Sequence, residues 1–164
     1  MDIDRFRQAM RRYASGVCVV AANRGADRCG MTVSAVSSVS AEPPMILVCL
    51  NRNSSSHGAL VTAERFSVNI LRAGDEDLAM IFAGQSGLRG ADKFNVGTWS
   101  CAGAPVLDTS LQTLLCEPAA CHDAGSHTIL IGHVVDVFGN SDGSAMVNFE
   151  GSFHQVPLNT PRAA

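Results

Sequence analysis

Apolar side chains at the start of the chain recur every three or four residues, which is the spacing of one face of a helix. Ile3, Phe6, Met10 and Tyr13 follow this spacing across residues 2–14, and arginines occupy the other faces. The pattern predicts an amphipathic opening helix. A glycine then interrupts it, and a different pattern begins.

Beyond this helix the apolar positions form short, often β-branched runs that are separated by glycine, proline and polar turns. Runs of this kind predict strands. The expected strands are residues 17–22, 29–39, 45–50, 65–71, 111–121, 127–138, 145–149 and 152–156, with a return to order at 104–107. Short helices are expected at 54–63 and 75–83, and the glycine-rich segment 85–97 is expected to be a mobile loop.

Strands outnumber helices, and no helix regularly follows each strand as a parallel sheet requires. The order of elements therefore predicts a mainly β fold, a Greek-key barrel with peripheral helices. A Rossmann fold is not supported, because no G-x-G-x-x-G sequence joins a strand to a helix. The length fits one domain, expected over residues 1–156, with a disordered tail at 157–164.

Composition and charge argue against several classes of function. The 164 residues are 46% hydrophobic and carry a net charge of -3, without a basic block or an apolar run of membrane-spanning length. We therefore expect neither a nucleic-acid partner nor a membrane span. The polar N-terminus shows no export signal, so a cytoplasmic protein with six reduced cysteines is expected.

Two polar clusters are candidates for binding chemistry. Hydroxyl groups are concentrated in residues 32–40, on a segment expected to be half buried, where they need hydrogen-bond partners. Residues 51–56 follow a strand and precede a helix, a position that favours an anion. The clusters can together hold a phosphate, although serine and threonine also simply suit strand and cap positions.

Metal and nucleophile chemistry find little support in the residues. Cys116, Cys121, His122, His127 and His133 are close in sequence, but they lack C-x-x-C or H-E-x-x-H spacing, so no metal site is predicted. No serine lies in a G-x-S-x-G sequence, which disfavours a hydrolase. The residues alone lead only to a small barrel with a hydroxyl-rich edge.

Several motifs in a fixed order resemble the short-chain flavin reductase family. They include FRQAM (residues 6–10), CGMTVSAVSSVS (29–40), LNRNS (50–54), FSVNIL (66–71), FAG (82–84), KF (93–94), PVL (105–107), GSH (125–127) and FH (153–154). The resemblance covers residues 5–156. It is strongest to the reductase component of 4-hydroxyphenylacetate 3-hydroxylase and related two-component monooxygenases.

The resemblance implies a split β-barrel that binds FMN or FAD at a homodimer interface and reduces it with NADH or NADPH. Reduced flavin would then pass to a separate flavin-dependent monooxygenase. By the same likeness the cofactor-binding residues are Thr32, Ser34, Ala35, Val36, Ser37, Leu50, Asn51, Ser54, Ser55, Phe82, Lys93, Phe94, Phe153 and His154. His127 would be the catalytic residue, where the nicotinamide stacks on the flavin. Cys18 and Ser126 depart from the usual family residues, threonine and an acidic residue.

Two other functions stay open at this point. A reductase of the same fold can pass electrons through bound flavin to ferric iron or another acceptor. A protein of this fold can also bind flavin without turnover. Oxidation of NADH that depends on added flavin separates the last possibility from the first.

Overall fold

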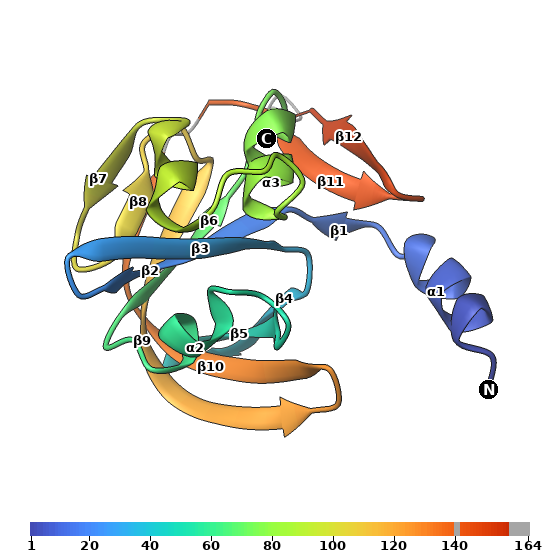
Figure 1. Ribbon diagram of the computed structural model, residues 1–164, viewed down its shortest axis with the longest axis horizontal. Helices are drawn as coiled ribbons and strands as arrows, with labels where there is room; N and C mark the ends of the chain where they lie inside the picture. The colour runs from blue at the N-terminus through green and yellow to red at the C-terminus, as the bar shows by residue number, and fades with distance from the viewer. Residues whose placement is uncertain (140–141, 158–164) are drawn as a thin grey trace, which may run out of the picture.

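The computed structural model describes residues 1–139 and 142–157, and its main feature is a seven-stranded antiparallel sheet (Figure 1). The sheet order is β3-β2-β6-β9-β10-β5-β4. Its strands are β2 (Cys18–Arg24), β3 (Asp27–Val33), β4 (Val36–Ala41), β5 (Pro44–Asn51), β6 (Phe66–Ile70), β9 (Gln112–Ala124) and β10 (His127–Gly139). The two edge strands, β3 and β4, are consecutive in the chain and joined only by Ser34 and Ala35. The sheet must therefore curl until its edges approach each other.

Smaller elements surround this sheet. A three-stranded sheet has the order β1-β11-β12, and a two-stranded sheet pairs β7 with β8. The remaining elements are β1 (Ser15–Gly16), β7 (Trp99–Cys101), β8 (Pro105–Leu107), β11 (Ala145–Phe149), β12 (Ser152–Val156), α1 (Ile3–Arg11), α2 (His57–Val61), α3 (Glu76–Phe82) and the 3-10 helix η1 (Gly90–Asn95). The structure is therefore mainly β with short helices, as the sequence predicted.

Strand β2 lies between two apolar clusters. Cys18 and Val20 pack into one cluster with residues of β3, β5 and β10, whereas Val19 and Ala21 pack into the other with α3 and η1. Successive side chains of a strand point to opposite faces, so both faces of β2 are buried. This position explains why the run 17–22 is continuously apolar rather than alternating.

The expected strand 29–39 is two strands. Residues up to Val33 pair with β2, whereas residues from Val36 pair with β5 at the opposite edge of the sheet. One straight strand cannot reach both partners, so the chain turns at Ser34 and Ala35. The sequence prediction was wrong here because both halves have the same strand-like composition.

Other boundaries also differ from the predictions. The opening helix ends at Arg11, and the helix expected at 54–63 forms only over α2, because side-chain turns occupy the preceding residues. The segment 85–97, expected to be a loop, contains η1 with Lys93 and Phe94 buried. Strand β7 was not predicted. The expected disordered tail, 157–164, lies outside the described residues beyond Pro157.

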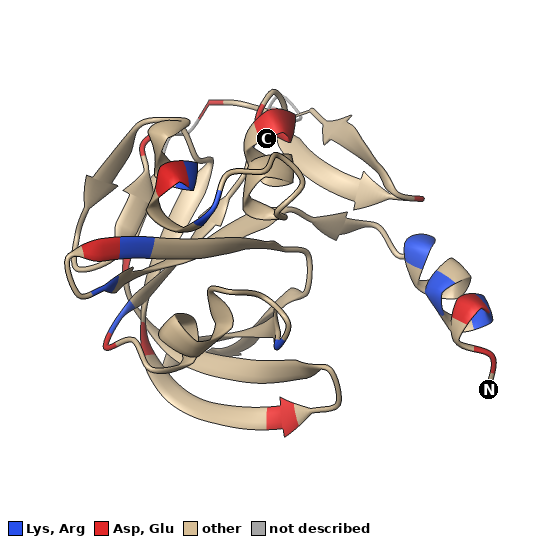
Figure 2. Cartoon of the chain, in the orientation of Figure 1, with Lys and Arg blue, Asp and Glu red and all other residues tan. Residues whose placement is uncertain are grey.

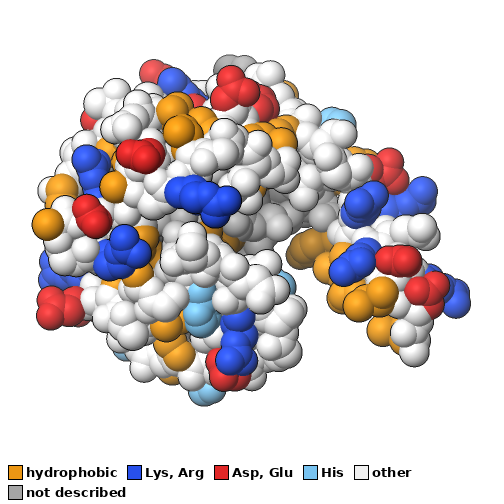
Figure 3. Space-filling view, viewed as in Figure 1, with side chains coloured by type: hydrophobic (Ala, Val, Ile, Leu, Met, Phe, Trp, Pro, Cys, Tyr) orange, Lys and Arg blue, Asp and Glu red, His pale blue; other side chains and the backbone are white. Residues whose placement is uncertain are grey.

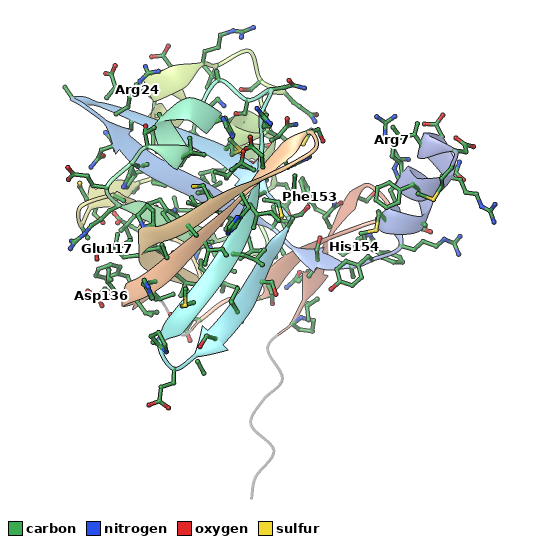
Figure 4. All side chains as sticks on the ribbon, turned by 90° about the horizontal axis from the view of Figure 1, so that it is seen from below. Arg7, Arg24, Glu117, Asp136, Phe153 and His154 are labelled. Atoms are coloured by element: carbon green, nitrogen blue, oxygen red, sulfur yellow. The ribbon has the colours of Figure 1, made fainter. Side chains whose placement is uncertain are left out.

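Helix α1 stands away from the rest of the structure (Figures 1 and 4). It has an apolar face but no buried residue. Charged residues are sparse on the large sheet and gather on α1, the β2–β3 turn and η1, as Figure 2 shows. Among the described residues, no helix has the length and apolar character needed to cross a membrane.

Candidate functional site

A polar cavity of about 400 Å³ lies where β3, the end of β5, the end of α3 and η1 come together. We call it the polar cavity. It is lined by Met31, Thr32, Asn51, Asn53, Ser54, Ser55, Phe82, Ala83, Gly84, Arg89 and Lys93. Six of the predicted cofactor-binding residues are in this set, although they come from four separate segments of the sequence. The fold therefore brings together much of the predicted site.

The loop from Asn51 to Ser56 is held by its own side chains. The Asn53 amide donates to Oδ1 of Asn51 at 2.9 Å, and the Ser56 amide donates to Oγ of Ser54 at 3.3 Å. The buried Ser56 hydroxyl donates to the Gly30 carbonyl at 2.9 Å, which fixes the loop to β3. These bonds hold the hydroxyl and amide groups of the loop at the polar cavity. The following helix, α2, has only five residues, so the loop itself provides the polar groups.

The opposite wall of the polar cavity is cationic. Lys93 is the only lysine of the sequence, and its side chain is only 6% exposed. Its Nζ lies 3.4 Å from the Phe82 carbonyl. Burial, and next the nearby Arg89, lower the pKa of Lys93. Because the described lining residues include no carboxylate, these two cations favour an anion in the cavity.

Aromatic packing holds this wall in place. The Phe82 ring contacts Phe94 edge to face with centroids 5.0 Å apart, and Trp99 lies 5.4 Å from Phe82. The Thr32 hydroxyl donates to the Ala79 carbonyl at 2.6 Å, which ties α3 to β3. The Thr32 hydroxyl proton is thus used within the protein. Its contribution to a ligand is then an acceptor oxygen and the methyl group.

The residues Ser34, Ala35, Val36 and Ser37 line a second, more apolar cavity of about 510 Å³. We call it the apolar cavity. Its other walls come from Tyr13, Ala14, Ser15, Gly16, Cys18, Leu47, Val68, Ile70 and Leu114. The side chains of Ser34, Ala35 and Ser37 are exposed. A slot with apolar walls and a few hydroxyl groups suits a planar ring with polar edges.

Five predicted site residues lie outside these two cavities. Leu50 is fully buried in the core, so only its backbone can reach a ligand. Phe94 is buried behind Phe82, with the Arg28 guanidinium 5.4 Å from its ring. Phe153 packs on the second apolar cluster, and His154 is exposed (both labelled in Figure 4). The ring centroids of His154 and Phe149 are 6.0 Å apart.

His127, the fifth of these residues, is the first residue of β10. Its Nδ1 lies 2.9 Å from the Ser126 hydroxyl. It pairs directly with Asn51 of β5, and residues paired in this way have side chains on the same face of a sheet. Since Asn51 lines the polar cavity, His127 is placed beside that cavity rather than in it.

Several residues of the two cavities were not expected from the sequence. Arg89 lines the polar cavity, and Tyr13 lines the apolar cavity. Asn53 also lines the polar cavity, and it belongs to the polar cluster 51–56 that the sequence indicated. Arg89 lies four residues before Lys93 in a glycine-rich segment, but this spacing does not show that the segment lies against the end of β5. Tyr13 gave no signal either, because it fits the apolar face of the opening helix.

Cysteine and histidine do not form a metal site in the described part of the chain. There, no three His, Cys, Asp or Glu side chains lie close enough to hold an ion. All six cysteines are free thiols. Burial raises the pKa of Cys18 and of Cys116 to about 12, so both are neutral near pH 7.

Comparison with known proteins identifies the family of the chain. Residues 10–157 match the model of the flavin reductase like domain. The chain is 36% identical over 160 residues to an FMN reductase (NADH) RutF of Pseudomonas syringae, covering 96% of this chain and 89% of that protein. It is 35% identical to the 4-hydroxyphenylacetate 3-monooxygenase reductase component of Pseudomonas aeruginosa, covering 97% and 94% of the two chains.

A solved structure with bound ligands also matches. The NADH:FAD oxidoreductase SgcE6 of Streptomyces globisporus, in complex with NAD and FAD fragments, superposes with a TM-score of 0.85 and 28% identity. The alignment covers 99% of this chain and 96% of that one. The fold and the matches define a flavin-dependent oxidoreductase. The chain belongs to the flavin reductase like family, as the resemblance predicted, and it is an NAD(P)H-dependent flavin reductase.

Proposed function

We propose that the chain transfers a hydride from NADH to FMN or FAD and passes the reduced flavin to a separate monooxygenase. The polar cavity carries this proposal, because its hydroxyl, amide and cationic groups fit the phosphate end of a flavin nucleotide. One relative is an FMN reductase (NADH), which supports NADH as the hydride donor and FMN as the acceptor. Another is a monooxygenase reductase component, which supports transfer of the reduced flavin to a monooxygenase. The cytoplasmic location expected from the sequence stays a prediction.

The phosphate end of the flavin is proposed to lie between the two walls of the polar cavity. Asn51, Ser54 and Ser55 donate hydrogen bonds from one wall, and Lys93 and Arg89 supply positive charge from the other. Phe82 closes the cavity between them. Arg89 is added here to the residues expected from the sequence.

The flavin ring is proposed to lie against Ser34, Ala35, Val36 and Ser37 in the apolar cavity. Bound flavin supplies the hydride acceptor, and the nicotinamide supplies the donor. The protein's task is to hold the two rings in contact and to exclude water. This task requires apolar walls and a few hydrogen bonds rather than a strong acid or base.

His127 is proposed to orient the nicotinamide, because it lies beside the polar cavity through its pairing with Asn51. Phe153 and His154 are proposed to contact the flavin from β12. Both lie outside the described cavities of one chain, so these roles fit best if a second subunit completes the site.

A split-barrel homodimer is proposed on two observations. The edge strands β3 and β4 are joined at Ser34 and Ala35, yet they do not pair with each other in the described structure. The barrel is therefore open between them, and its unpaired edges need cover. Helix α1 projects with Phe6 49% exposed and Met10 50% exposed, and a hollow separates it from the body in Figure 3. An apolar helix face of this kind needs cover, and a second copy of the chain provides it.

Light scattering tests the dimer. The parent is expected to have about twice the chain mass of 17.2 kDa at micromolar concentration. A Phe6→Asp/Met10→Asp variant should shift toward the single-chain mass, whereas Gln8→Ala, on the opposite side of the same helix, should not. A parent that runs as a single chain would contradict the homodimer.

The activity is tested by following NADH oxidation under anaerobic conditions with riboflavin, FMN and FAD in turn. Stoichiometric oxidation of NADH that depends on added FMN or FAD is expected. An absence of flavin-dependent oxidation, with the folded protein shown to bind flavin, would contradict the proposed reaction.

A further inference from the structure

Four polar side chains from separate elements form a continuous chain of contacts next to the Asn51–Ser56 loop. Nε2 of His57, at the start of α2, lies 2.9 Å from Oγ1 of Thr128 on β10. The Thr128 hydroxyl donates to Oδ1 of Asp123 on β9 at 3.1 Å. Oδ2 of Asp123 lies 3.2 Å from Nη1 of Arg52. We call these four residues the His57–Arg52 chain.

The directions of these hydrogen bonds follow from the number of protons. A threonine hydroxyl has one proton, and Thr128 donates it in the hydrogen bond to the Asp123 carboxylate. Oγ1 of Thr128 must therefore accept a hydrogen bond from Nε2–H of His57. Both oxygens of the carboxylate are then used, one by Thr128 and the other by Arg52.

Burial decides which link matters most. The Arg52 and Asp123 side chains are 47% and 68% exposed, and an ion pair this open contributes little by itself. Thr128 is only 3% exposed. Its hydroxyl is the buried centre of the His57–Arg52 chain. Loss of this hydroxyl would leave Nε2 of His57 and Oδ1 of Asp123 without their shared partner.

The His57–Arg52 chain joins the two parts of the proposed site. The Arg52 amide also donates to the Ser126 carbonyl at 3.0 Å, so the Asn51–Ser56 loop is tied to the β9–β10 turn by backbone and side chain together. The same turn leads into His127, which pairs with Asn51. Thr128 follows directly and points to the opposite, buried face.

We infer that Thr128 is a positioning residue that sets the distance between the loop lining the polar cavity and His127. The inference rests on the proposed function, in which the loop holds the flavin phosphate and His127 orients the nicotinamide. Thr128 touches neither ligand. It acts by locking the β9–β10 turn, through Asp123 and Arg52, and α2, through His57.

The test compares Thr128→Val, which keeps the shape and removes the hydroxyl, with Thr128→Ser, which keeps the hydroxyl. In anaerobic stopped-flow experiments, Thr128→Val is expected to lower the limiting rate of flavin reduction by NADH at least threefold, with the FMN dissociation constant within twofold of the parent. Thr128→Ser should reduce flavin at the rate of the parent. A control, Thr113→Val, removes a buried hydroxyl with two hydrogen bonds at the far end of β9 and should leave the rate unchanged.

Two further measurements separate positioning from a purely structural role. In a His127→Ala background, adding Thr128→Val should change the rate less than twofold, because the residue to be positioned is gone. Independently of activity, hydrogen exchange at the Arg52 amide should accelerate at least tenfold in Thr128→Val, while amides of β6 exchange as in the parent.

The outcomes are distinct. A parent that fails to reduce flavin with NADH would refute the proposed function. The exchange measurement would still test whether Thr128 holds the β9–β10 turn to the Asn51–Ser56 loop. A parent-like reduction rate in Thr128→Val, or a rate loss that Thr113→Val shows equally, would overturn the inference. Unchanged exchange at Arg52 would overturn it as well.

Discussion

Replacement of Lys93 by methionine should weaken the binding of FMN much more than the binding of riboflavin. Lys93 is buried in the wall of the polar cavity, and in the described part of the chain its Nζ donates to the Phe82 carbonyl at 3.4 Å. A hydrogen bond between a charged donor and a phosphate contributes about 1.5–3 kcal/mol. This contribution corresponds to a loss of FMN affinity of about tenfold to about 150-fold.

Riboflavin has the same ring and ribityl chain but no phosphate, so its dissociation constant should stay within about twofold in Lys93→Met. Quenching of flavin fluorescence measures both constants. Arg24→Met removes the same charge from an exposed ion pair with Asp27, and it should leave both constants near the parent values. An equal loss of affinity for riboflavin and FMN would show that Lys93 shapes the cavity rather than binding phosphate.

The lowered pKa of Lys93 gives the same experiment a pH dependence with a definite sign. Burial and Arg89 disfavour the protonated amine in the free protein, so its pKa lies below the ordinary value of 10.5. FMN affinity should fall as pH rises through that lowered pKa, because the cation is lost, while riboflavin affinity should not. For stability the sign is opposite. The unfolded chain keeps more protons on this amine, so the destabilisation by Lys93 is full below its folded pKa and is relieved as pH rises toward 10.5.

Three more outcomes are expected. The Ser34→Ala/Ser37→Ala variant should weaken FMN and FAD binding at least tenfold in the same fluorescence titration, and parent-like binding would remove both residues from the site. His127→Ala should slow anaerobic flavin reduction at least fivefold with an unchanged melting temperature, and a large drop in that temperature would assign His127 to the fold. Gly132→Ala should destabilise the protein by about 1–3 kcal/mol in urea unfolding, because the new Cβ would lie 2.6 Å from Phe66. Parent-like stability would mean that the ring moves freely.

The sequence predicted those parts of the fold that depend on local pattern. The polar turns and prolines between the expected strands correctly marked the turn between β2 and β3 and the turn between β4 and β5. The break at Ser34 and Ala35 could not be predicted in this way. It exists because β2 and β5, the partners of β3 and β4, lie toward opposite ends of the sheet, where they pair with β6 and β10. These pairings with later segments of the chain leave no mark in the composition of residues 29–39.

The site divides in the same manner. The loop from Asn51 to Ser56 was visible as a cluster because its members are neighbours in the sequence, and they act as neighbours in the structure. The facing wall was visible only through the family resemblance for Lys93, and Arg89 was missed, because nothing local says that η1 folds back onto the end of β5.

The buried threonine at the centre of the His57–Arg52 chain illustrates a further limit. Thr128 lies in a strand where threonine is common, so its residue type carries no functional signal. Its importance comes from what the sheet places on either side, Asp123 in the neighbouring strand and His57 in the helix above. A residue that is ordinary in sequence can thus connect the two ends of a site. Thr128→Val removes this hydroxyl but keeps the shape of the side chain. It therefore tests whether the position of His127 relative to the loop, rather than a direct contact with a ligand, sets the rate of flavin reduction.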